Sequence, residues 1–236
     1  MKFYLTGFGK FNGVEDNPTT HLMNNIVQHY KQTTTTTSSS SLPITIDVDT
    51  VRSAQQQQQQ QQQCSVVVDI VGVDILEVSA VSAKQKIDQL AQQYPNDHIT
   101  LIHFGVDSNA QAFRLERCGW NEANFRVPDE RGWQPANESI DANDTNSHNV
   151  TSIPITNVVS NLSPKHLVQP SDDPGRFICN YIYYHSLTLS KQSQGRVHSL
   201  FVHVPPFHVI SMDKQLEFVV DLLQNLSTTL CKSINQ

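Results

Sequence analysis

The sequence has few cysteines and few positive charges, and it lacks any long apolar run. Its four cysteines are widely spaced and form no CxxC pair, which favours free thiols over a disulfide framework. The net charge is −6 and no block of Lys or Arg stands out, which argues against a nucleic-acid-binding surface. No apolar stretch reaches membrane-spanning length, and the first residues do not read as a secretory signal. We therefore expect a cytoplasmic protein that binds neither nucleic acid nor membrane.

Two tracts of low complexity interrupt the chain. Residues 33–41 contain only Thr and Ser, and residues 55–63 are an uninterrupted run of Gln. Neither tract has an apolar face to bury, so we expect both to be insertions into loops of one domain that spans residues 1–236. A further polar stretch at about 137–149 is predicted to be an irregular loop.

Outside these tracts, apolar strand-like segments alternate with helical patterns. Residues 65–73 and 98–105 have the apolar content of buried strands, whereas residues 82–93 and 213–232 have apolar residues at helical spacing. The alternation predicts a single-domain, three-layer α/β/α sandwich with a mostly parallel twisted sheet. Further strands are expected over 2–6, 43–51, 150–154 and 199–204, and further helices over 21–31, over the stretch up to 168 and over 175–188.

Cys179 is the cysteine with the most distinctive surroundings. The Asp-Asp-Pro-Gly sequence at 172–175 predicts a helix start, which places Cys179 in the first turns. Amide N–H groups and the helix dipole favour the reactive thiolate at such a position, although Asp172 and Asp173 would oppose it if they lay close. The alternative is that Cys179 is a small buried apolar residue, which is the better interpretation of a lone helical cysteine.

His203 and Glu116 are the candidate partners of a nucleophile. His203 lies near the end of an apolar strand that two prolines stop, a place that favours catalytic groups in parallel sheets. Glu116 could accept a hydrogen bond from an imidazole and fix its tautomer. Taken alone, His203 is as well explained as a core histidine and Glu116 as a surface ion pair with a neighbouring arginine. His103 and His208 have similar surroundings, and no HxxxH or Cys/His cluster indicates a metal site.

Together and in this order, several segments resemble the pyroglutamyl-peptidase I (pyrrolidone-carboxylate peptidase) family of cysteine peptidases. The start of the chain, Leu5 to Gly13, looks like the family's Thr-Gly-Phe-x-Pro-Phe-Gly-Gly. The resemblance runs from the first predicted strand to the last helix and fails over both low-complexity tracts and much of 137–148. The other matching segments are Asn17-Pro18, Gly105 with Leu115-Glu116-Arg117, Arg126-Val-Pro-Asp129 with Gly132-x-Gln134-Pro135, Gly175-x-Phe177-x-Cys179-Asn180-Tyr181 and Phe201-Val-His203-Val-Pro205.

The resemblance implies a cysteine omega-peptidase that hydrolyses the bond after an N-terminal pyroglutamyl residue of peptides, without cofactor or metal. It implies that Cys179 is the nucleophile, that His203 activates it and later protonates the leaving amine, and that Glu116 orients His203. Arg126 and the Cys179 amide would stabilise the oxyanion. The residues that match the family's substrate pocket are Phe8, Phe11, Asn17, Phe177 and Ile178. Core packing is the alternative for each phenylalanine, and a helix cap is the alternative for Asn17.

The chain also departs from the family pattern. Val106 stands where the family often has Gln, and Glu130 stands where Asn is common. These changes bear on the substrate pocket and leave the Cys, His and Glu in place. Two other functions stay open: a catalytically silent relative that acts as a protein-interaction module, and a related amidase for a different N-terminal cap. The sequence leaves both a monomer and a homo-oligomer open.

Overall fold

The computed structural model describes every residue except 12, 15, 36–67 and 235–236. The predicted strand over 43–51, the Gln tract and residues 36–41 of the Thr/Ser tract lie outside the described residues. Residues 33–35 of that tract belong to a helix that ends at Thr35, so this helix extends beyond the predicted end at residue 31 and into the expected loop insertion.

Four parallel strands form the larger part of a six-stranded sheet with the order β2-β1-β3-β8-β4-β7. Each strand of β2-β1-β3-β8 runs parallel to its neighbour. The four strands are β1 (Lys2–Phe8), β2 (Asp69–Leu76), β3 (Ile99–Val106) and β8 (Val197–Val204). Because these strands share one direction, their carboxyl ends meet at one edge of the sheet, where parallel α/β proteins usually place their sites.

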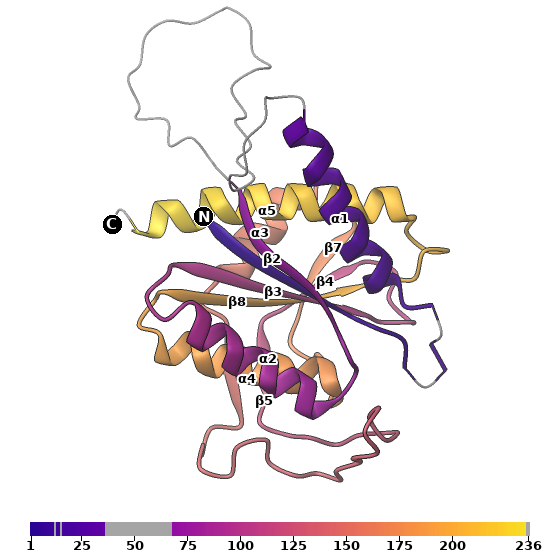
Figure 1. Cartoon of the computed structure of the whole chain (residues 1–236), viewed down its shortest axis with the longest axis vertical. Coiled ribbons are helices and arrows are strands. Elements are labelled where there is room, and N and C mark those ends of the chain that lie inside the picture. Colours follow the sequence, from indigo (N-terminus) through magenta and orange to yellow (C-terminus); the bar gives the residue numbers. More distant parts are fainter. Residues whose placement is uncertain (12, 15, 36–67, 235–236) are drawn as a thin grey trace, which may run out of the picture.

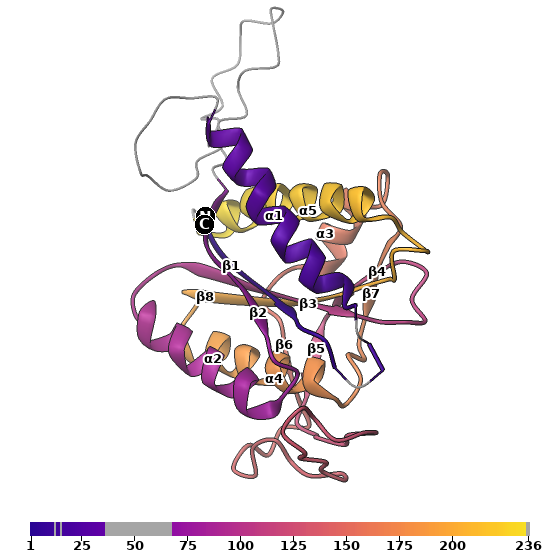
Figure 2. The ribbon, with the colours of Figure 1, turned by 45° about the vertical axis from the view of Figure 1, so that its right-hand side comes forward.

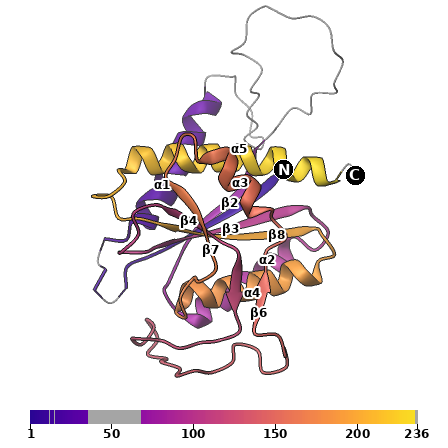
Figure 3. The same cartoon turned by 180° about the vertical axis from the view of Figure 1, so that it is seen from behind.

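Two short strands complete the sheet on the side away from β2 (Figure 3). β4 (Phe113–Glu116) pairs antiparallel with β8, and β7 (Val168–Ser171) pairs parallel with β4. β5 (Cys118–Trp120) and β6 (His148–Val150) form a separate two-stranded ribbon. The sheet is therefore mostly parallel, as the alternation of segments predicts.

Helices cover both faces of the sheet (Figures 1 and 2). On one face lie α1 (Pro18–Thr35), α3 (Ile155–Leu162) and α5 (Met212–Ile234), and on the other lie α2 (Ala80–Gln93) and α4 (Ile178–Gln192). Two apolar clusters fill the spaces between sheet and helices, one on each face. The prediction of a three-layer α/β/α sandwich is confirmed. In the described part of the chain, no helix has both the length and the apolar character needed to cross a membrane.

Capping residues explain where two of the helices begin. α1 starts at Pro18, before the predicted residue 21, because Asn17 Oδ1 accepts from the Thr19 amide at 3.0 Å and proline suits a first helical position. α2 starts at Ala80, where the Ser79 hydroxyl accepts from the Ser82 amide at 3.1 Å.

Two predicted strands are shifted along the chain. The strand expected over 65–73 is β2, at Asp69–Leu76, and the strand expected over 150–154 is β6, which ends at Val150. The polar stretch 137–149 forms turns and bends until β6 begins at His148, because few of its side chains can join a core.

Candidate active site

Cys179 is the second residue of α4, at the edge where the parallel strands end. Phe177 is the N-cap, and its side chain has no polar atom with which to cap the first amides. These N–H groups and the helix dipole favour negative charge at Cys179. Asp172 and Asp173 do not oppose it, because Asp172 pairs with Arg117 and Asp173 pairs with Arg176.

His203 and Glu116 form a buried pair beside the half-buried Cys179. His203, near the end of β8, is 7% exposed, and its imidazole interacts electrostatically with the neighbouring Cys179 side chain. Its Nδ1 lies 2.8 Å from Oε1 of Glu116, the last residue of β4. The antiparallel pairing of β4 with β8 sets this distance, since it places Glu116 opposite Phe201.

Glu116 is fully buried, at 0% exposed. The alternative interpretation, a surface ion pair with a neighbouring arginine, is wrong, because Arg114 pairs with Asp107 and Arg117 pairs with Asp172. Among the described residues, Oε2 of Glu116 has no hydrogen-bond partner. Among the described residues, His203 is therefore the group to which this carboxylate is hydrogen-bonded.

The charge state of His203 follows from these contacts. Burial by itself lowers the pKa of His203, but the hydrogen bonds and charges of Cys179 and Glu116 outweigh it and raise the pKa to about 10. At neutral pH the arrangement therefore favours an imidazolium next to the Cys179 sulfur. A thiolate at a helix N-terminus, paired with an oriented imidazolium, is able to attack a carbonyl carbon and then protonate a leaving group.

The other candidate histidines and cysteines have different surroundings. His103 Nδ1 lies 2.7 Å from the Thr6 hydroxyl, and burial lowers the pKa of His103 to about 3, so its ring stays neutral. His208 is exposed. Cys118 donates to the Asp172 carbonyl at 3.2 Å, and burial raises the pKa of its thiol to about 11. Among the candidate histidines, His203 is therefore the one that lies beside Cys179.

Gly105 makes room for the Cys179 sulfur. It lies on β3 directly opposite His203 in the pairing with β8. A Cβ atom at this position would lie 2.9 Å from Cys179 Sγ and 2.7 Å from the ring of Phe201. Both contacts are closer than van der Waals packing allows, so a larger residue would displace the sulfur or the ring.

We expect Gly105→Ala to lower kcat about tenfold or more, because small displacements of a nucleophile are costly. The matched control is Gly72→Ala on β2, since a Cβ at Gly72 would lie 2.2 Å from the Tyr4 ring. Both variants should lose thermal stability, and only Gly105→Ala should lose turnover per folded molecule. Equal turnover in the two folded variants would contradict a steric role for Gly105.

Aromatic side chains gather next to the helix start. Phe177 is half-buried, its ring centroid lies 6.2 Å from that of Phe11, and Phe8 at the end of β1 is buried. Phe125 packs edge-on against Phe177 at 4.9 Å and Trp133 packs against Phe125 at 5.0 Å. Phe125 and Trp133 are not among the pocket residues predicted from the sequence. Phe125 directly precedes the predicted site residue Arg126, and this position could have indicated that Phe125 lies near the site.

The other predicted pocket residues differ in surroundings. Ile178 is buried in the core on the α2–α4 face of the sheet. The Asn17 amide donates to the Gly9 carbonyl at 2.9 Å and caps α1, so it holds the loop after β1 in place. Arg126 is exposed, and no hydrogen bond or ion pair joins its guanidinium to another described residue.

The loop that carries Arg126 is anchored at Asp129. One carboxylate oxygen of Asp129 accepts from the first amide of α2, at Ala80, at 2.9 Å. The other accepts from the amides of Arg131 and Trp133, each at 2.9 Å. A buried carboxylate at a helix N-terminus is stabilised by the helix dipole, so this contact fixes the loop against α2.

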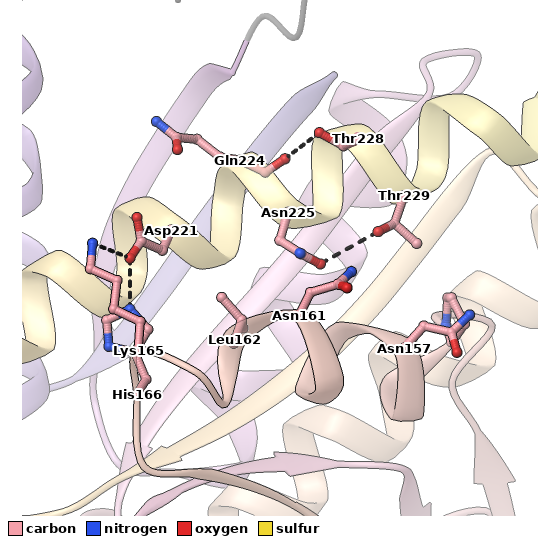
Figure 4. Close-up of a pocket in the computed structure, with 11 residues that line it drawn as sticks. Asn157, Asn161, Leu162, Lys165, His166, Asp221, Gln224, Asn225, Thr228 and Thr229 are labelled. Carbon is pink, nitrogen blue, oxygen red and sulfur yellow. Dashed lines mark hydrogen bonds and ion pairs between the residues drawn. The ribbon is translucent and has the colours of Figure 1, made fainter.

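A groove of about 740 Å³ lies between α3 and α5 (Figure 4). These helices are on the opposite face of the sheet from α4, the helix that carries Cys179. Lys165 and His166 in this groove both contact Asp221, each at 2.7 Å. We therefore place the candidate chemistry at Cys179 rather than in this groove. No group of three or more His, Cys, Asp or Glu side chains among the described residues is arranged to hold a metal ion.

Comparison with known proteins shows the family of the chain and proteins with a similar fold. The model of the pyroglutamyl peptidase family matches residues 46–222. A pyrrolidone-carboxylate peptidase of Fusobacterium nucleatum is 29% identical over 136 residues, which are 56% of this chain and 62% of that protein, so the match spans about three fifths of its length. Pyrrolidone-carboxylate peptidase 2 of Caldanaerobacter subterraneus is 21% identical over 91% of this chain and 85% of that protein. The crystal structure of pyrrolidone carboxyl peptidase from Pyrococcus furiosus has the same fold, with a TM-score of 0.73 and 22% identity over 98% of this chain and 100% of that one.

Proposed function

This chain belongs to the pyroglutamyl peptidase family, and we propose that it is a cysteine omega-peptidase that removes an N-terminal pyroglutamyl residue from peptides. The observation that carries the proposal is that Cys179 lies beside His203, whose Nδ1 is bonded to the buried Glu116 carboxylate. A structural cysteine needs neither a helix start nor an oriented imidazolium. Those two features together are typical of a nucleophile.

In the proposed reaction, the Cys179 thiolate attacks the carbonyl carbon of the pyroglutamyl residue. The N–H of Cys179 and the guanidinium of Arg126 stabilise the oxyanion that forms. His203 gives its proton to the leaving amine, the C–N bond breaks, and a thioester remains on Cys179. Neutral His203 then takes a proton from a water molecule, whose oxygen attacks the thioester, and free pyroglutamate leaves as the thiolate returns. Throughout, Glu116 holds the imidazole and stabilises its charge.

The aromatic shell suits the proposed substrate. A pyroglutamyl ring is small, flat and uncharged, so apolar walls with a few hydrogen-bonding groups match it. Phe8, Phe11 and Phe177 would form these walls with Ile178 behind them, and Phe125 extends the wall at Phe177. The role we propose for Asn17 is to hold the loop between Phe8 and Phe11 through its bond to Gly9.

The test is selectivity among amides of one fluorophore. We expect cleavage of the pyroglutamyl amide to exceed that of the prolyl and glutamyl amides by about a hundredfold or more. Proline lacks the lactam carbonyl and N–H, which would leave polar groups of the pocket unpaired, and glutamate adds charges that aromatic walls cannot solvate. The measurement is kcat/KM for the three amides. Comparable values for all three would favour an amidase for another cap, and no cleavage of any would favour a silent interaction module.

The proposal has consequences for partners and location. The partners are peptides with an N-terminal pyroglutamyl residue. We also propose a cytoplasmic location, where the thiols of Cys118 and Cys179, which form no disulfide in the described part of the chain, would stay reduced. Fractionation of cells that express the tagged chain tests this, and recovery in a secreted fraction would contradict it.

A further inference from the structure

The hydroxyl of Tyr183 lies where the three elements of the candidate site meet. Tyr183 is on α4, one helical turn after Cys179, and is 0% exposed. It donates to the main-chain carbonyl of Glu116, the last residue of β4, at 2.7 Å. The backbone of Phe201 on β8 and the side chain of Thr151 lie near this hydroxyl, and the Tyr183 ring packs against the Phe201 ring with centroids 5.9 Å apart. Tyr183 therefore contacts β4 through its hydroxyl and β8 through its ring, from the helix that carries the thiol.

Glu116 needs such support because little else holds its side chain. Its Oε1 contacts His203, and Oε2 is buried without a hydrogen-bond partner among the described residues. A carboxylate that is bonded only to the group it must orient takes its position from its own backbone. The bond from Tyr183 fixes that backbone at Glu116 itself.

We propose that Tyr183 is a positioning residue that sets the distance and angle between Cys179, His203 and Glu116. The proposal rests on the proposed function, since it concerns the same site. The Tyr183 hydroxyl does not touch the reacting atoms, because it faces the far side of Glu116, at the main-chain carbonyl. It acts by holding α4 to the ends of β4 and β8, so that the thiol and the imidazole meet in one geometry. Catalytic groups lose much of their effect when they move by about 1 Å.

Tyr184 offers a matched comparison on the same helix. Its ring is also buried, and its hydroxyl donates to Asp144 Oδ2 at 2.9 Å. Asp144 lies in the loop before β6, outside the strands that carry Glu116 and His203. Tyr183→Phe and Tyr184→Phe thus remove the same atom and one hydrogen bond each, and only the first bond reaches the candidate site.

The experiment measures kcat and KM for a pyroglutamyl amide, and the rate of Cys179 alkylation by iodoacetamide against pH, for wild type and both variants. We expect Tyr183→Phe to lower kcat about tenfold with KM changed less than about twofold, and to move thiolate formation to higher pH. Tyr184→Phe should leave both readouts at wild-type values, even if the two variants lose similar thermal stability. A general loss of packing would not move the pH profile of one thiol.

A second comparison separates a role through Glu116 from a role elsewhere. In a Glu116→Gln background, Tyr183→Phe should change kcat by much less than in wild type, because the two residues act as one unit. Fully additive effects, or a folded Tyr183→Phe with wild-type kcat and pH profile, would overturn the proposal. If Tyr183→Phe does not fold, Thr151→Val removes the other hydroxyl at this junction, and an unchanged pH profile there would also overturn it. A wild-type protein without pyroglutamyl-amide activity would refute only the proposed function, because the pH profile of Cys179 alkylation would still test the positioning role of Tyr183.

Discussion

Cys179→Ser is expected to lower kcat for a pyroglutamyl amide by about a thousandfold or more while the protein keeps its fold. Serine has nearly the size of cysteine, so the first turn of α4 can keep its packing. A serine hydroxyl holds its proton far more tightly than a thiol, and it would not form the anion that the helix start and the charged His203 favour at this position. The measurements are steady-state turnover and the thermal unfolding midpoint of the variant.

Cys118→Ser is the matched control for this variant. Cys118 is buried, bonds to the Asp172 carbonyl, and has a thiol whose pKa burial raises to about 11. We expect its replacement to leave turnover near the wild-type value. Iodoacetamide should inactivate the wild type in step with labelling of Cys179, as read by peptide mass spectrometry. Substantial turnover in Cys179→Ser, or inactivation that follows labelling of another cysteine, would exclude Cys179 as the nucleophile.

The central part of the fold could be predicted from sequence because its signals are local. β3 and β8 are mostly apolar, and α2 and α5 show helical spacing over many residues. The short strands β4 and β7 could not be predicted in this way. β4 alternates Phe113 and Leu115 with charged residues over four positions, and β7 contains Pro170. They become strands because β4 pairs with the edge of β8 and β7 then pairs with β4, a non-local cause that no short window contains.

Part of the candidate site could not be predicted from the sequence either. Cys179, His203 and Glu116 each had a plain structural explanation, and only the resemblance to a family selected them. The burial of Glu116 could not be inferred, because an arginine follows it directly and another precedes it by two residues. In the structure, both arginines turn away to Asp107 and Asp172.

Two contributions to the site depend on segments far apart in the chain. The contact of Gly105 with the Cys179 sulfur joins β3 to α4. The packing of Phe125 on Phe177 requires the loop after β5 to fold back toward α4. Neither leaves a pattern at a fixed spacing, so these contacts emerge only when the chain is folded. The catalytic roles themselves stay predictions, and turnover measurements decide them.

Glu116→Gln is expected to lower kcat about a hundredfold with KM changed less than about threefold. Glutamine has the same shape and can still accept a bond from His203 Nδ1, so substrate contacts should persist. It lacks the charge that favours the imidazolium. Glu116 contributes to raising the pKa of His203, so its neutralisation lowers that pKa and His203 loses its proton at lower pH.

The sign of this shift makes the pH profile decisive. The rate falls on the alkaline side when His203 can no longer protonate the leaving amine, so the alkaline limb of kcat/KM should move to lower pH by about one unit or more in Glu116→Gln. The control is Glu217→Gln, since Glu217 lies on α5, across the sheet, and pairs with Lys165 and Lys214. Its alkaline limb should coincide with that of the wild type. A Glu116→Gln profile that also coincides, with unchanged kcat, would make Glu116 a buried structural acid and leave Cys179 and His203 to act as a dyad.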